Sequence, residues 1–77
     1  MNKSRRKELS SIITELENLK ERLDFLSEEE QEAADNMPES LQGSHQFFTM
    51  EENVSEIDDA NEELSAVIDT LQEVIGK

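Results

Sequence analysis

Apolar residues recur at alternating spacings of three and four along two long segments of this chain, and no other feature constrains its fold as strongly. The first series is Leu9, Ile12, Leu16, Leu19, Leu23 and Leu26. The second series is Met50, Val54, Ile57, Asn61, Leu64, Ile68, Leu71 and Ile75. Heptad spacing of this kind places the side chains along one face of an α-helix. The sequence therefore predicts two long amphipathic helices.

The segment between the two series contains the only proline of the chain, Pro38, and one of its two glycines, Gly43. Proline disfavours helical geometry in the residue before it, so we expect the first helix over about 4–35 and a loop over 36–48. A connection this short makes consecutive helices antiparallel neighbours. The spacing of the two series therefore predicts a helical hairpin.

The start of the second helix has two candidate signals. Thr49 followed by Glu52 fits a capping box and predicts a helix over about 49–75, whereas a start near Ser44 is the alternative. A chain of 77 residues is long enough for one domain. We therefore predict a single all-α domain over 1–77, an antiparallel two-helix hairpin with coiled-coil-like packing.

Folding the chain back at the loop pairs the two apolar series layer by layer. The expected layers include Leu9 with Ile75, Leu16 with Ile68, Leu19 with Leu64, Leu23 with Asn61, and Leu26 with Ile57. This register keeps charged side chains out of nearly every layer, which is what a stable seam between two helices requires.

A third apolar position widens the apolar face of the second helix, because Ala60, Val67 and Val74 recur every seven residues. Three apolar positions per heptad are typical of a bundle helix rather than of a two-stranded coil. We therefore expect two hairpins to form a homodimeric four-helix bundle, with Val67 and Val74 among the oligomerisation residues. The alternative is a monomeric hairpin that leaves these side chains in water.

Asn61 interrupts the second apolar series and is the third residue that we assign to oligomerisation. Its expected neighbour in the hairpin, Leu23, offers no hydrogen-bond partner, and an unpaired buried amide costs about 1–3 kcal/mol. Asn61 of a second copy could supply that partner and fix the register and oligomeric state. The alternative is that Asn61 lies at the solvent edge of the seam and bonds water.

Charge is distributed very unevenly along the chain. The net charge is −13, and no Lys or Arg occurs between Leu23 and Gly76, a stretch that holds 16 of the 20 Asp and Glu residues. A negative field of this strength repels nucleic acid and anionic membranes and attracts basic protein surfaces. The sequence therefore predicts a protein partner with a basic groove, and argues against direct binding to nucleic acid or to membranes.

The second helix carries the acidic residues that form the candidate partner-binding face. They are Glu51, Glu52, Glu56, Asp58, Asp59, Glu62, Glu63 and Asp69, none of which belongs to the apolar series. Carboxylates along a rod resemble the row of phosphates on a nucleic acid, so nucleic-acid mimicry is one interpretation. The other interpretation is that these acids serve solubility alone.

Two aromatic residues, Phe25 and Phe48, lie outside the apolar series and are candidate anchors for a partner. They favour an alternative function, a structural or assembly adaptor that binds through its helix faces. In a bundle, however, Phe25 could pack in the dimer and Phe48 could cover its end. We expect Phe47 to extend the apolar seam instead of contacting a partner.

Residues suited to catalysis are scarce. The chain has no Cys, and its only histidine, His45, is expected to be exposed in the loop. Helix-surface carboxylates splay apart, whereas a calcium site needs about six to eight converging oxygens. We therefore expect no enzymatic activity, no cofactor and no bound metal. No apolar run approaches the roughly 18 residues needed to cross a membrane, and we expect a cytoplasmic protein.

The turn Asn-Met-Pro-Glu-Ser-Leu-Gln-Gly-Ser at 36–44, followed by an acidic heptad helix, supports a family resemblance. The chain resembles short, acidic helical-hairpin proteins encoded by phages and prophages of Gram-positive bacteria, most specifically over 28–64. That group has no catalytic or binding residues to transfer to this chain. The resemblance implies a phage origin and a place in the cytoplasm of a bacterial host. It implies a small protein that binds and inhibits a host protein, such as a defence or nucleic-acid-handling factor.

Overall fold

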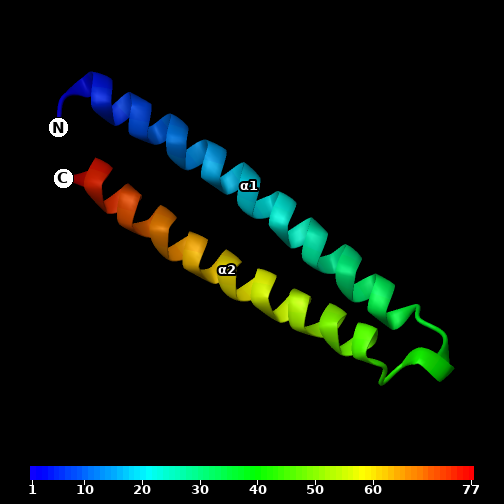
Figure 1. Ribbon diagram of the computed structural model, residues 1–77. Helices are drawn as coiled ribbons and strands as arrows, with labels where there is room; N and C mark the ends of the chain where they lie inside the picture. Colours follow the sequence, from blue (N-terminus) through cyan, green and yellow to red (C-terminus); the bar gives the residue numbers. More distant parts are fainter.

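The chain folds into two long helices joined by a short connection, and the computed structural model describes all of its residues, 1–77. Helix α1 spans Lys3–Asp35, the 3-10 helix η1 spans Glu39–Leu41, and helix α2 spans His45–Gly76. Figure 1 shows α1 and α2 side by side, with both chain termini at one end and the connection at the other. The fold is therefore the predicted antiparallel hairpin, with principal extents of 60 × 15 × 12 Å.

Helix α2 begins at His45, so the expected start at Thr49 is wrong and the earlier alternative holds. The Ser44 hydroxyl caps the helix by accepting a hydrogen bond from the backbone N–H of Phe47 at 3.2 Å. Gly43, with φ of +92°, supplies the left-handed conformation that turns the chain into this cap. Thr49 instead lies inside the helix, where its hydroxyl donates to the His45 carbonyl at 2.9 Å.

The predicted apolar series of α2 faces α1. Asn61 and Ile68 are buried, and the remaining members of the series are half-buried: Met50, Val54, Ile57, Leu64, Leu71 and Ile75. The heptad pattern alone therefore identified the packing face of this helix. Phe47 is also half-buried and extends the same face toward the connection.

Helix α1 turns a different face to its neighbour than the sequence predicts. Its buried residues are Ile13, Ser27 and Ala34. The predicted seam residues Ile12, Leu19 and Leu26 are instead 39 %, 44 % and 53 % exposed. The residue that follows each of the three is less exposed: Ile13 and Ser27 are buried and Lys20 is half-buried. Relative to the prediction, α1 is therefore rotated about its own axis by roughly 50°, half the step between successive residues.

Small side chains and polar pairing both favour this rotation. Ser27 and Ala34 occupy little volume, so the two backbones can approach closely where these residues lie between the helices. The rotation also brings polar groups of α1 within reach of α2. Ser27 donates a hydrogen bond to Asp58, and the Asn61 amide donates to the Lys20 carbonyl. Without an acceptor on α1, the buried Asn61 amide would lose about 1–3 kcal/mol.

The predicted register survives the rotation. Leu19 and Leu64 line one shared groove, and Leu26 and Ile57 line another. These residues therefore lie at the expected heights along the hairpin, but beside a surface groove instead of in the seam. The register of the two helices depends on the length of the connection, whereas the rotation of α1 depends on side-chain contacts. The predicted register can therefore be correct although the predicted rotation is wrong.

Only a small part of the hairpin's side-chain surface is buried between its two helices. Five of the 77 residues are buried, and no large side chain is fully enclosed. Ile13, Ala34 and Ile68 are the buried apolar residues. Neither helix includes a segment with the length and apolar character that crossing a membrane requires.

Candidate functional site

The predicted acidic residues of α2 are all exposed: Glu51, Glu52, Glu56, Asp58, Asp59, Glu62, Glu63 and Asp69. At about 100° per residue they cover the outer side of α2 and both of its flanks, and leave free the side that faces α1. They therefore form a broad coat on α2 and not a single narrow stripe. Their role in binding a partner stays a prediction.

One face of the hairpin is polar across both helices, and we call it the polar face. A shallow groove on it is lined by Asp24, Ser27, Glu28, Gln31, Val54 and Asp58. The Ser27 hydroxyl donates to Asp58 Oδ1 at 2.6 Å, across the two helices. Charge-assisted hydrogen bonds of this kind are stronger than neutral ones. Asp58 therefore has a structural role in addition to its predicted place in the acidic coat.

Two further carboxylates of α1 accept hydrogen bonds from amides of α2. Asn53 Nδ2 donates to Glu30 Oε2 at 2.9 Å, and Asn61 Nδ2 donates to Asp24 Oδ1. Glu30 and Asp24 both lie outside the first apolar series. Neither pairing has a signal in sequence spacing, because each joins residues more than twenty positions apart.

Asn61 differs from its expected environment. Its side chain is 4 % exposed and lies beside Lys20 and Asp24, not opposite Leu23 alone. The amide nitrogen therefore finds partners within the hairpin, and a second copy is not needed to satisfy it. The amide oxygen Oδ1 is buried without a hydrogen-bond partner. Asn61 therefore gives no support for oligomerisation, and with 4 % of its surface exposed it does not lie at the solvent edge of the seam.

The opposite face of the hairpin is apolar, and we call it the apolar face. Leu16, Leu19, Arg22, Leu23, Leu26 and Leu64 line a groove there. Ile12 and Val67 belong to this face by their heptad positions, and Val67 is 47 % exposed. Val74 follows Val67 after seven residues and is half-buried. Apolar positions from α1 and α2 thus meet on one side of the molecule.

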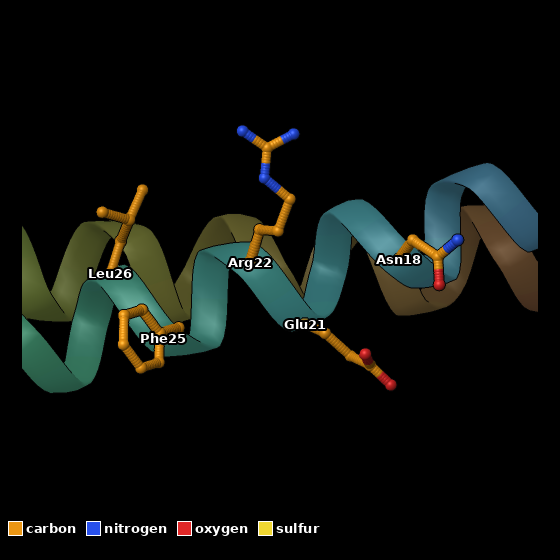
Figure 2. Close-up of a pocket in the computed structure, with 5 residues that line it drawn as sticks. All are labelled: Asn18, Glu21, Arg22, Phe25 and Leu26. Atoms are coloured by element: carbon orange, nitrogen blue, oxygen red, sulfur yellow. The ribbon is translucent and has the colours of Figure 1, made fainter.

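The candidate aromatic anchors are both on the surface. Phe25 is 62 % exposed and Phe48 is 58 % exposed, whereas Phe47 is half-buried. Figure 2 shows Phe25 on the outer side of α1, beside a shallow pocket whose other lining residues are Asn18, Glu21, Arg22 and Leu26. Phe48 makes an edge-to-face contact with Phe47, with ring centroids 5.8 Å apart. Both rings therefore present most of their surface to solvent.

Groups for metal binding do not converge in this fold. No three His, Cys, Asp or Glu side chains lie in an arrangement that could hold a metal ion. His45, expected in the loop, is the first residue of α2 and is exposed. The surface of the hairpin offers carboxylates on the polar face and on the outer sides of the helices, and alkyl groups on the apolar face.

Comparison with known proteins finds no matching family model, no similar curated protein and no similar solved structure.

Proposed function

We propose that this protein is a non-enzymatic binding protein that occupies a basic groove on another protein, where its carboxylates take the place of nucleic-acid phosphates. One observation carries the proposal. Every acidic residue of α2 is exposed, and no Lys or Arg between Leu23 and Gly76 neutralises them. A surface that needed charge only for solubility would use mixed signs and gain helix-stabilising Glu–Lys pairs.

The dimensions of the hairpin suit such a groove. Nine carboxylates lie on α2 between Glu51 and Glu73, which at 1.5 Å per residue is about one per 4 Å of helix. Duplex DNA presents about one charge per 1.7 Å of axis, so α2 alone has a little under half of that density. The acidic residues of α1 add to it. The hairpin is thus an elongated polyanion with fixed positions for its charges.

The biological setting follows from the resemblance of the turn at 36–44 and its acidic helix to phage hairpin proteins. In that setting the protein acts in the bacterial cytoplasm and inhibits a host factor that handles nucleic acid or takes part in defence. Such factors have basic grooves, and an acidic rod competes there by electrostatic attraction.

The experiment is a competition between this protein and duplex DNA for basic proteins of a bacterial lysate. Proteins retained on the immobilised hairpin should elute between low and moderate salt and should be displaced by duplex DNA. Reversing Asp59, Glu62 and Glu63 to Lys should abolish retention. Reversing Glu8, Glu17 and Glu21 makes the same change in net charge on α1 and should weaken retention much less. Retention that is indifferent to salt would rule out mimicry.

A second candidate function is an assembly adaptor, and the exposure of Phe25 and Phe48 favours it. Large exposed aromatic rings are strong anchors in protein interfaces. In this case the carboxylates serve solubility, and binding depends on the rings and not on ionic strength.

We also propose that two hairpins assemble into a four-helix bundle. The support is the apolar face, since Leu19, Leu26 and Val67 remain exposed in a single hairpin. Burying a side chain of this size contributes about 1.5–3 kcal/mol.

A further inference from the structure

The apolar face is built around the middle of α1. Leu19 is the central residue of helix α1, Lys3–Asp35, and Ile12 and Leu26 lie seven residues before and after it. All three are exposed, and seven residues make two helical turns, so they form one straight row. Because Leu19 is central, reversing a second copy end to end places this row on itself.

The hairpin exposes more surface than a compact chain of its mass. Its accessible surface is 5855 Å², whereas a compact monomer of 8.8 kDa exposes about 4,800 Å². The difference, about 1,000 Å², exceeds the roughly 800 Å² that each partner loses in a stable protein–protein interface. The surface that this elongated hairpin exposes in excess of a compact chain is therefore of the size that a stable dimer interface buries.

Charge is polarised along the hairpin and decides how two copies can lie together. Residues 1–20 and 65–77, the terminal half, carry six Lys or Arg and five Asp or Glu, a net charge of +1. Residues 21–64, the loop half, carry one Arg and fifteen Asp or Glu, a net charge of −14. If the loops of the two copies lay at the same end of the dimer, the two strongly negative loop halves would lie within a Debye length, about 8 Å, of each other. In a head-to-tail pair the loop end of each copy lies beside the terminal end of the other. Each negative loop half then faces a nearly neutral terminal half.

We infer that a second copy of this chain covers the apolar face, in head-to-tail orientation, with Leu19 of each copy near the two-fold axis. This deepens the four-helix bundle proposed above and rests on it. It does not depend on what the carboxylates bind, because most acidic residues of α2 point away from the apolar face; Glu56 and Glu63, four residues before Ala60 and Val67, lie at its edge.

The inference also assigns a partner to Arg22, the one basic residue of the loop half. Figure 2 shows Arg22 extending from α1 on the same side as Leu26, while Glu21 points the other way. Glu15 precedes Arg22 by seven residues and therefore lies on the same side of α1. Since Glu15 and Arg22 lie on either side of Leu19 in sequence, a head-to-tail pair brings Arg22 of each copy beside Glu15 of the other. Two ion pairs then border the interface.

Orientation can be measured without altering the interface, because the chain has no cysteine of its own. Ser4→Cys and Ser40→Cys place a spin label at the terminal end and at the loop end, both at exposed residues. Two Ser40→Cys copies should show a label separation close to the 60 Å length of the hairpin. A mixture of the two variants should show a short Ser4-to-Ser40 separation. A Ser40-to-Ser40 distance within about 20 Å, two helix diameters, would overturn the orientation.

A charge swap tests the register. Arg22→Glu alone and Glu15→Arg alone should each weaken the dimer about tenfold, because two attractive pairs become repulsive. The double variant should restore the affinity of the unchanged protein. With loops together, Arg22 would instead face Glu63 of the other copy, since Leu64 lies at the height of Leu19 and Leu23. Rescue of Arg22→Glu by Glu63→Arg and not by Glu15→Arg would contradict the inference.

The use of the apolar face is tested by sedimentation. The unchanged protein should have twice the 8.8 kDa mass of one chain, and Leu19→Asp should reduce it to one. Leu41→Asp is the matched control, because Leu41 is 46 % exposed, close to the 44 % of Leu19, but lies in η1. A mass of one chain for the unchanged protein at tens of micromolar would overturn the inference while leaving the salt-dependent binding test unaffected.

Discussion

Ser27 Oγ lies 2.6 Å from Asp58 Oδ1, and this hydrogen bond joins a buried residue of α1 to an exposed carboxylate of α2. The bond accompanies the rotation of α1, because a helix that turns Ser27 toward its neighbour must turn Leu26 away, and Leu26 is 53 % exposed. The apolar face therefore exists because a serine, and not the adjacent leucine, lies between the helices.

Ser27→Leu tests this rotation. A leucine at a position of close approach overpacks the interface and removes the hydrogen bond, so we expect a loss of about 1–3 kcal/mol in the free energy of unfolding. Ser11→Leu makes the same chemical change at an exposed position of α1 and should stay within about 0.5 kcal/mol. Chemical denaturation followed by circular dichroism measures both. Equal effects of the two substitutions would show that Ser27 does not lie between the helices.

Asn61→Asp should destabilise the hairpin in a pH-dependent way. The substitution places a second carboxylate beside Asp24 at a site that is 4 % exposed. Burial and the neighbouring negative charge both raise the pKa of the introduced carboxyl in the folded state. The unfolded chain then releases this proton more readily, so stability falls as the pH rises above about 4. Thermal unfolding between pH 4 and pH 7 should show the loss growing with pH.

The control is Asn61→Leu, which has no titrating group. It removes an amide whose oxygen is buried without a partner, and its effect should be pH-independent and neutral or stabilising by about 1 kcal/mol. A flat pH response for Asn61→Asp would show that this site is hydrated and not buried.

Ser44→Ala should shorten or fray the start of α2. The Ser44 hydroxyl accepts a hydrogen bond from the Phe47 backbone, and losing such a cap costs about 0.5–2 kcal/mol. Thr49 is the helix cap that the sequence pattern predicted, but it lies inside α2. Thr49→Ala therefore removes no capping hydrogen bond. Since alanine is the better helix former, Thr49→Ala should be neutral or slightly stabilising. Amide hydrogen exchange at 46–50 distinguishes the two outcomes by position.

Phe25→Ala separates the two candidate functions. Phe25 is 62 % exposed, so its removal should change the free energy of unfolding by less than about 0.5 kcal/mol. If the protein is an adaptor, the same substitution should weaken partner binding by about 2 kcal/mol at any ionic strength. If it is an acidic mimic, binding should respond to salt and little to Phe25. Calorimetric titration at two salt concentrations with the captured partner measures both dependences.

Much of the architecture could be predicted from residue spacing alone. The heptad series defined two helices and the packing face of α2, and the short connection set an antiparallel register in which Leu19 and Leu64 meet. The absence of Lys and Arg between Leu23 and Gly76 predicted an acidic surface without any knowledge of the fold. These features depend on local periodicity and on composition, which are properties of the chain before it packs.

The rotation of α1 could not be predicted in this way, and the candidate site depends on it. Adjacent residues such as Leu26 and Ser27 compete for the same place, and hydropathy favours the leucine. The choice depends on groups of the other helix: the Asp58 carboxylate accepts from Ser27, and the Asn61 amide donates to the Lys20 carbonyl. A hydrogen bond between residues thirty or more positions apart leaves no trace in helical periodicity. Residue spacing therefore predicts where helices form, whereas the face that each helix buries is decided when polar groups of the two helices meet.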